Sequence, residues 1–550
     1  MTTRTTLAVA LALSAVVFFA PAPEAPLGTV VAATGVLAQA GRYPASRHGG
    51  NYMHNYYVPP APSSTPWAPS WAPDGESIAV AMSGSIWRVA SDTGIADELT
   101  YSPDAYHSSP DWSPDGRWIV YTADYDGERV QLEILDVDTG ETRALTDDRH
   151  VYTDPTFSPS GDRISYVSTR PNGYFNVSVR PVAEGQWAGD EMQITTDNTF
   201  GSDRLYFGTW DMHLTPTWLP GGEELLLVSN REVPLGSGNA VRVPAVEGGI
   251  RNATTVLREQ TLYRTRPDVA SDGKRFVYSS TRGAADQFNN LYVQPTVGGE
   301  PYKLTFFQHD AFHPRWSPDD EWIAFIMNEG GLPLLALLET HGGELRRVAI
   351  SERHWKRPMG VLSLSTRDSD TGEVTGSRVH LAASDGKFYA PADAYARISG
   401  QGDHLFHTPG RFTVELPVGN VELTLVKGFE FWPETTTAAI VVDDLSRPTP
   451  AAVIIPALLE ELLAAGASQV VPEILEGSLM LVTQVLQLSG VPMSRILKRV
   501  RKERGGQVPP ARHQRRIEPM VRDQREAEAL EAAAQIVRKP ARRGRQRKHG

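Results

Sequence analysis

Polar and charged side chains recur one and three positions before a proline along the first two thirds of this chain. The prolines concerned are Pro110, Pro155, Pro216, Pro267 and Pro314. Each lies in an expected β-strand, and residues two apart in a strand share a face because side chains alternate with period two. The candidate ligand-binding residues with this spacing are His107, Tyr152, Asp154, His213, Arg264, Arg266 and His313. If the strands surround one channel, these side chains form a collar suited to a small anionic or metal-bound ligand, or to a protein.

A plainer interpretation of the collar is that its polar side chains satisfy one another and bind channel water. A metal site is a third possibility, although histidines on separate strands need not converge on one ion. The sequence therefore assigns neither catalytic nor metal-binding residues, and it predicts no cofactor.

A short sequence close to Trp-Ser-Pro-Asp-Gly, followed at once by a β-rich run, recurs over the same region. The copies start at Trp71, Trp112, Phe157, Trp218, Val269 and Trp316. Their spacing suits one four-stranded sheet per copy, because proline presets a turn and Asp-Gly supplies a side-chain cap and a left-handed position. The fourth copy has Gly-Gly for Asp-Gly and the fifth lacks proline, so these two turns are the least certain. The pattern predicts a mainly β fold that begins with a six-bladed β-propeller over residues 41–355.

Most copies also end their repeat on Leu-Thr or Ile-Thr, as at Leu99-Thr100 and Leu145-Thr146. Together with the recurring turn, this resembles the TolB-like (PD40) β-propeller over about residues 60–350. The resemblance implies a radial arrangement of blades around a channel.

Residues 356–445 change character, with alternating apolar runs between Gly, Asp and Pro turns, which predict a small β-sandwich. The sequence segments from Trp355 to Gly360 and from Asp385 to Pro391 resemble the carboxypeptidase-regulatory-like domain of CehA/McbA-type amidohydrolase proteins. In that family a catalytic domain with paired histidines and a divalent metal follows. After Pro450 the chain has only His513 and His549. We therefore expect the catalytic metal domain to be missing, and a divalent metal only where that domain is present.

Residues 446–505 predict an α/β fragment of αβα type. Its sequence segments from Leu462 to Ala467 and from Val470 to Glu473 resemble the end of the RCK domain of Kef-type cation/proton antiporters. The glycine-rich phosphate loop of such domains has no counterpart here. Residues 506–550 form a basic tail, expected to be disordered or partly helical. Because no aromatic residues interleave its charges, it predicts no nucleic-acid partner.

The N-terminal region has the features of an export signal. An apolar run from Leu7 to Ala20 follows Arg4, and Ala38-Gln39-Ala40 offers a cleavage site, so residues 1–40 are predicted to be a signal peptide. A retained membrane anchor is the alternative, and no further membrane span is expected. The chain has 550 residues, a net charge of −12 and no cysteine, which excludes disulfides and thiolate chemistry.

These features favour a TolB-like binding or scaffold module that is exported to the periplasm or the extracellular space. We expect it to derive from an amidohydrolase-family protein and to be a fusion or truncated product. Its partner would be an unknown protein or a small anionic ligand. One alternative is a metal-dependent hydrolase or peptidase-associated enzyme that uses the propeller channel. Another is a regulatory fragment of potassium/proton antiport.

Overall fold

The computed structural model describes residues 64–125, 129–196, 211–231, 233, 238–259, 266–282, 287–398, 404–428, 431, 433–441 and 449–455. The predicted signal peptide, the basic tail and most of the RCK-like fragment therefore lie outside the described residues, as does Arg264. The described chain is almost entirely β-structure, with short 3-10 turns at η2 (Gly249–Asn252) and η3 (Glu329–Gly331).

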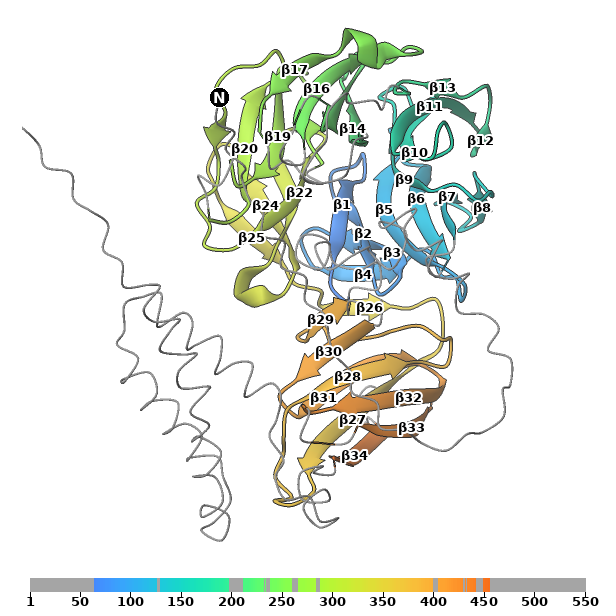
Figure 1. Cartoon of the computed structure of the whole chain (residues 1–550), viewed down its shortest axis with the longest axis vertical. Helices are drawn as coiled ribbons and strands as arrows, with labels where there is room; N and C mark the ends of the chain where they lie inside the picture. The colour runs from blue at the N-terminus through green and yellow to red at the C-terminus, as the bar shows by residue number, and fades with distance from the viewer. Residues whose placement is uncertain are drawn as a thin grey trace, which may run out of the picture. The chain divides into compact units, whose positions relative to one another are not determined.

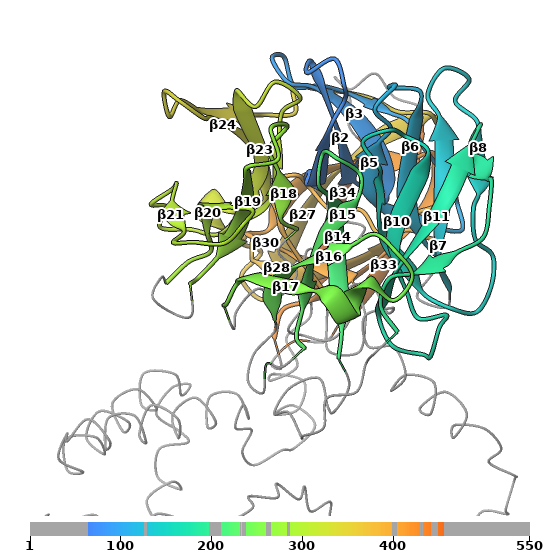
Figure 2. The same cartoon turned by 90° about the horizontal axis from the view of Figure 1, so that it is seen from above.

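Six sheets of antiparallel neighbours follow one another between residues 67 and 348. The first sheet contains β1 (Trp67–Trp71), β2 (Ser77–Met82), β3 (Ser85–Ala90) and β4 (Ile95–Glu98), and the second contains β5 (Tyr106–Trp112), β6 (Trp118–Tyr125), β7 (Arg129–Asp136) and β8 (Thr142–Ala144). The third contains β9 (Tyr152–Phe157), β10 (Arg163–Ser168), β11 (Asn176–Ala183), β12 (Gln186–Trp187) and β13 (Met192–Gln193), and the fourth contains β14 (His213–Trp218), β15 (Glu224–Ser229), β16 (Asn239–Pro244) and β17 (Thr254–Leu257). The fifth contains β18 (Asp268–Val269), β19 (Arg275–Ser280), β20 (Asn290–Pro295) and β21 (Tyr302–Lys303), and the sixth contains β22 (Ala311–Trp316), β23 (Trp322–Met327), β24 (Leu334–Glu339) and β25 (Leu345–Val348). Figures 1 and 2 show these sheets side by side in sequence order around a common centre, as in a β-propeller.

The recurring turn has the same geometry in all six copies. In the second copy the Gly116 N–H donates to the Ser113 carbonyl at 2.9 Å, with Gly116 at φ 77°. The same bond closes the two divergent copies, at Gly222 and Gly273. In the sixth copy Asp320 occupies the glycine position at φ 59°, which aspartate tolerates better than most residues. The motif therefore predicted every turn, including the two that depart from it.

The Leu-Thr and Ile-Thr pairs bind the end of a sheet to its third strand. Each threonine hydroxyl oxygen accepts a backbone N–H from that strand, at 2.8 to 2.9 Å. The pairs are Ile86 with Thr100, Leu132 with Thr146, Val177 with Thr195, and Leu291 with Thr305. The motif is thus explained by the need to satisfy a buried backbone donor where the fourth strand ends.

Apolar cores lie between neighbouring sheets rather than at one centre. The cluster between the sixth and first sheets includes Trp67, Trp71, Phe312 and Leu337. Across this contact the Trp71 Nε1–H donates to the Arg315 carbonyl at 3.2 Å. The chain then returns to the first sheet, where β26 (Glu352–His354) pairs in parallel with β4.

Residues 359–455 form two further sheets. Their strands are β27 (Met359–Asp368), β28 (Ser377–Ala382), β29 (Tyr395–Ile398), β30 (His404–Thr408), β31 (Arg411–Pro417), β32 (Gly419–Val426), β33 (Glu434–Ile440) and β34 (Thr449–Ile455). The strand orders are β31-β27-β34 and β29-β30-β28-β32-β33. The mainly β character of this region agrees with the predicted sandwich, and β34 extends it past residue 445. Within the described ranges, no helix is long and apolar enough to cross a membrane.

Candidate functional site

A β-bulge interrupts the innermost strand of five sheets at the proline. The residue before each proline has a left-handed backbone, with φ between 48° and 51°. These residues are Ala68, Ser109, Asp154, Thr215 and His313. In β5 the partners shift from Ser108↔Thr122 to Asp111↔Val120, so three steps on one strand match two on its neighbour. The same shift occurs in β1, β9, β14 and β22. Because the strain recurs in sheet after sheet, it belongs to the architecture and marks no single functional residue.

The bulge interrupts the regular alternation on which the expectation of a shared face for residues one and three before the proline was based. The residues three before it lie in the packing between sheets. The His107 ring is buried, with Nδ1 2.7 Å from the Thr100 hydroxyl and its centroid 4.8 Å from that of Tyr121. Burial, together with the charge of Lys387, lowers the pKa of His107 to about 3. The candidate residue His107 is therefore a neutral core side chain away from the collar.

Tyr152 and His213, at the same position in β9 and β14, are also interior residues. The Tyr152 ring packs near Tyr166, with ring centroids 5.9 Å apart, and its hydroxyl donates to Asp148 at 2.8 Å. His213 has no exposed surface. His313 is one before its proline, and its ring meets the Trp67 ring edge-on at 4.8 Å.

Five ionisable side chains next to the prolines interact electrostatically with one another, and we call them the inner ring. They are Asp111, Asp154, Arg266, Asp268 and Arg315. The Arg315 Nη1–H donates to the Arg266 carbonyl at 3.2 Å and lies 4.0 Å from Asp268 Oδ1. The Arg266 Nη2–H reaches the Pro155 carbonyl at 3.5 Å, joining the segment before β18 to the third sheet. The sequence prediction included Asp154 and Arg266 but missed the three residues that follow a proline, because it considered only the positions before each proline.

Residues that follow the proline also connect neighbouring sheets. The Trp112 N–H donates to Ser70 Oγ at 3.2 Å, the Phe157 N–H to Asp111 Oδ2 at 2.8 Å and the Trp316 N–H to Asp268 Oδ2 at 2.7 Å. These bonds join the first sheet to the second, the second to the third and the fifth to the sixth. Asp111 and Asp268 therefore have a structural role whatever the ring binds.

The two arginines of the inner ring are buried, and its three carboxylates are partly buried. Burial raises the pKa of Asp111 to about 6, although the bond from Phe157 and the charges of Arg266 and Arg315 oppose the shift. Burial also raises the pKa of Asp268. Burial and the neighbouring Arg266 lower the pKa of Arg315 to about 10. Three carboxylates thus face two guanidinium groups, an arrangement richer in acceptors than the expected anion-binding collar.

Asp111→Asn is expected to flatten part of the pH dependence of stability. The pKa of Asp111 is higher in the folded chain than its ordinary value, so its contribution is fully present below the unfolded pKa of about 4 and is lost as pH rises through about 6. Urea unfolding of both proteins at pH 5 and pH 7.5 measures the effect. The wild type should lose more stability than the variant between these values, and an equal loss would contradict the assignment.

Asp154 is the ring carboxylate that is open to a ligand. It is partly exposed and forms no hydrogen bond with another described residue, while its charge acts on Arg315. By contrast, Asp111 and Asp268 each accept a backbone N–H. A ligand that donates hydrogen bonds or carries a positive charge can therefore be met by Asp154 without breaking contacts between sheets.

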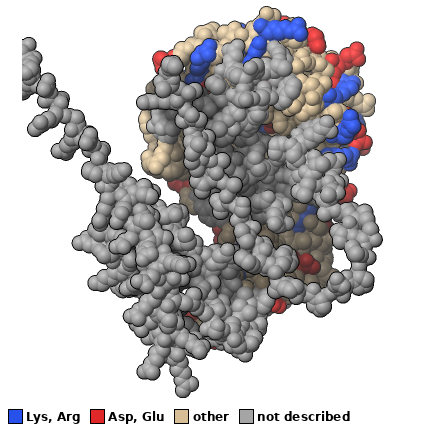
Figure 3. All heavy atoms as spheres, viewed as in Figure 1, with Lys and Arg blue, Asp and Glu red and all other residues tan. Residues whose placement is uncertain are grey.

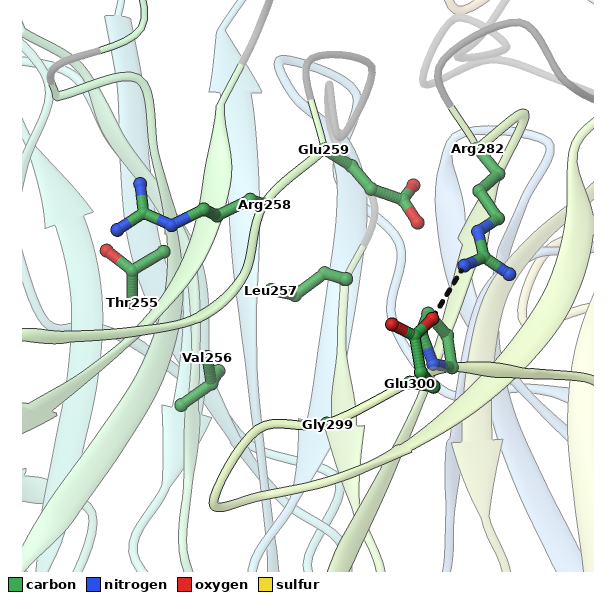
Figure 4. Close-up of a pocket in the computed structure, with 9 residues that line it drawn as sticks. Thr255, Val256, Leu257, Arg258, Glu259, Arg282, Gly299 and Glu300 are labelled. Atoms are coloured by element: carbon green, nitrogen blue, oxygen red, sulfur yellow. Dashed lines mark hydrogen bonds and ion pairs between the residues drawn. The ribbon is translucent and has the colours of Figure 1, made fainter.

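A second feature is a cavity of about 590 Å³ between the fourth and fifth sheets. Figure 4 shows its walls, formed by the end of β17 and by the segment around Gly299 and Glu300. Arg282 donates to the Glu300 carboxylate at 3.2 Å, and the buried Glu259 accepts from the Tyr278 hydroxyl at 3.0 Å. Burial raises the pKa of Glu259. No motif in the sequence pointed to this cavity.

Charges on the described surface are mixed in sign. On the face shown in Figure 3, Lys and Arg side chains lie among Asp and Glu side chains. Some form exposed pairs, such as Arg117 with Glu184 at 2.8 Å and Arg347 with Glu329 at 2.6 Å. Across the described parts of the chain, no group of three or more His, Asp or Glu side chains is placed to hold a metal ion.

Comparison with known proteins identifies the repeated sheets. The TolB β-propeller domain family (PD40) matches residues 62–203, so the chain contains a TolB-like β-propeller domain. The uncharacterized peptidase YuxL of Bacillus subtilis is 33% identical over 106 residues, which cover 18% of this chain and 16% of the relative. The uncharacterized protein Atu1656 of Agrobacterium fabrum is 28% identical over 165 residues, or 29% of this chain and 53% of the relative.

Proteins of the Tol-Pal system are also similar. TolB of Francisella tularensis is 33% identical over 63 residues, covering 12% of this chain and 14% of the relative. Among solved structures, TolB from Acinetobacter baumannii has a TM-score of 0.38 and 18% identity, over 54% of this chain and 68% of that one. The chain spans between about a seventh and about half the length of these curated relatives.

Proposed function

We propose that this chain is an exported binding protein whose propeller holds a polypeptide segment at the inner ring. The observation that carries this proposal is the partly exposed Asp154 carboxylate, which forms no hydrogen bond within the described chain and lies beside buried, charged neighbours. A polypeptide is favoured as the ligand class because similar segments occur in a protein called a peptidase and in a Tol-Pal system protein. Export rests on the predicted signal peptide.

A closed six-bladed ring is part of the proposal. The shared core between the sixth and first sheets and the bond from Trp71 to Arg315 support closure. Closure would place residues next to the prolines around one channel, so that a ligand at one end meets several sheets at once.

The ligand is expected to donate hydrogen bonds to the ring. Arg315 and Arg266 already donate to backbone carbonyls. Asp154 keeps free acceptor capacity, which suits backbone N–H groups and basic side chains. This favours a basic polypeptide over the small anionic ligand that the sequence suggested.

Asp154→Asn is expected to weaken binding of a basic peptide. The probe is an array of synthetic peptides of one length that differ in net charge, followed by fluorescence anisotropy with the tightest binder. A hydrogen bond to a charged group is worth about 1.5–3 kcal/mol, so the dissociation constant should rise by about 10- to 100-fold. Asp92→Asn, an exposed position in a turn of the first sheet, is the matched control and should bind as wild type does. Equal affinity of Asp154→Asn and wild type for every bound peptide would sink the proposal.

The finer assignments beyond the propeller remain sequence-based predictions. They comprise the derivation of residues 356–445 from an amidohydrolase-family protein and the Kef-like origin of residues 446–505. Neither assignment is needed for binding at the inner ring.

A further inference from the structure

The fifth sheet has the shortest innermost strand of the six. Its β18 has two residues, whereas the other innermost strands have five to seven. The aromatic residue that ends the other strands is replaced here by Val269, and the following proline by Ser271. We call the contact between the fourth and fifth sheets the 4/5 seam. It has a shorter innermost strand and a smaller side chain at the end of that strand than the other contacts.

Among the described residues, the core of the 4/5 seam contains no tryptophan. Its cluster is Leu219, Leu226, Val228, Ala240, Val256, Leu257, Phe276, Tyr278 and Tyr292. Each of the other five clusters of described residues between sheets contains at least one tryptophan. Val269, where tryptophan stands in four other copies of the turn, is only partly buried. Less apolar area is thus buried where the innermost strands meet.

A hydrogen bond from a backbone N–H of one innermost strand to a side chain of its neighbour forms at three of the six seams. Within the described residues it does not form at the 4/5 seam, nor at the third-fourth and sixth-first seams. At three other seams a side chain after the proline accepts a backbone N–H from the next sheet. Thr217 occupies that position in β14, but within the described chain it forms no bond to Val269. The bonds that join these two sheets lie instead near the outer strand β17. There Gln294 Nε2–H donates to the Val256 carbonyl, and Glu259, just after β17, accepts from the hydroxyls of Tyr278 and Ser280.

The cavity lies at this same seam. Its walls belong to β17 and the residues after it on one side, and to Arg282 and the Gly299–Pro301 turn on the other. In Figure 4 the Arg282 guanidinium group faces Glu300, whose side chain is almost fully exposed. When the two sheets separate, water can hydrate these polar side chains. Opening this part of the seam therefore exposes little additional apolar surface.

The sixth-first seam provides the contrast. The chain does not run directly from the sixth sheet into the first, so this seam would be the natural place for a ring to open. It is instead held by Trp67 and Trp71, by the Trp71 bond to Arg315 and by the pairing of β26 with β4.

We propose that the ring opens at the 4/5 seam and that the opening is a lateral entrance through which a polypeptide reaches the inner ring. Arg266 lies two residues before the start of β18 and touches the third sheet, so separation of β14 from β18 exposes the ring from the side. Lateral entry admits an internal segment of a chain and requires no free end. The role as an entrance rests on the proposed function, whereas the opening itself does not.

Cross-linking can test the opening, because the chain has no cysteine of its own. A Cβ on Gly273 would lie 3.4 Å from Pro220 Cδ across the 4/5 seam, and a Cβ on Gly161 would lie 3.4 Å from Pro114 Cδ across the second-third seam. Pro220→Cys/Gly273→Cys and Pro114→Cys/Gly161→Cys, each joined with a short thiol-reactive cross-linker, are thus a matched pair. Hydrogen exchange of the full chain, followed by mass spectrometry without ligand, reports opening at β17 and β19.

Before cross-linking, amides of β17 and β19 should exchange on the order of ten-fold faster than those of β6 and β10. The 4/5 cross-link should remove the difference, and the control cross-link should leave it. Val269→Trp, which restores the usual aromatic, should slow the same amides without a cross-linker. Equal exchange at both seams, or exchange unaffected by the 4/5 cross-link, would overturn the proposal. Faster exchange at this seam, combined with unchanged peptide binding by Asp154→Asn, would keep the opening and reject the inner-ring site.

Discussion

Replacing Arg357 with leucine is expected to lower the free energy of unfolding by about 3–5 kcal/mol, because it leaves a buried carboxylate without its counter-ion. The partner is Glu98, whose side chain has 0% exposure. Glu98 accepts from Ser85 Oγ at 2.7 Å and from the Lys356 N–H at 2.8 Å, in addition to Arg357. The Arg357 guanidinium group also lies 4.0 Å from the centre of the Tyr101 ring.

Urea unfolding at pH 7 measures this loss. The double variant Glu98→Leu/Arg357→Leu should be more stable than Arg357→Leu alone, because it removes the stranded charge together with its partner. Arg378→Leu changes an exposed arginine of β28 and serves as the control, with little expected effect. A double variant no more stable than the single one would show that packing, rather than the ion pair, accounts for the loss.

Arg315→Met is expected to destabilise the chain by about 3–5 kcal/mol at pH 7.5 and by less at pH 5. The guanidinium group of Arg315 acts on both Asp268 and Asp111, whose pKa values burial already raises. Without it both carboxyl groups take up protons more readily, so lowering the pH neutralises the stranded charges. The variant should therefore regain stability relative to wild type as pH falls through about 6.

Unfolding of Arg315→Met and wild type at the two pH values checks this result, with Arg378→Met as the control for loss of an exposed arginine. A penalty that is the same at both values would mean that the inner-ring carboxylates do not respond to Arg315. It would also remove the electrostatic basis of the site.

The sequence predicted the repeated sheets well because their signals are local. Pro, Asp and Gly determine the turn within five residues, and even Gly222 and Gly273 in the divergent copies close the same bond. The Leu-Thr pairs were visible as a pattern, and the structure supplies their reason in the bond between Thr100 and Ile86.

The candidate site was predicted only in part. The spacing found Asp154 and Arg266 but also selected His107, Tyr152 and His213, which pack between sheets. Regular alternation was assumed, whereas a bulge interrupts it at the proline of the innermost strand in five sheets. Proline within a strand is a known indication of a bulge, and with it Asp111 and Arg315 could have been found.

The weakness of the 4/5 seam was partly visible in the sequence. The sequence marks the fifth copy of the turn as divergent because it lacks the proline; its missing aromatic residue was not used. Its consequence depends on the core against which Val269 packs, whose described residues include no tryptophan. Such contacts between distant segments cannot be inferred from one sequence.

The central claim, that a polypeptide binds at the inner ring, is tested most directly by mapping hydrogen exchange with and without the tightest basic peptide from the array. The account predicts slower exchange of amides in the innermost strands, β5, β9, β14 and β22, around Asp154, with none of this protection in Asp154→Asn. Protection confined to outer strands such as β4, β8 and β25, and equally present in Asp154→Asn, would contradict it.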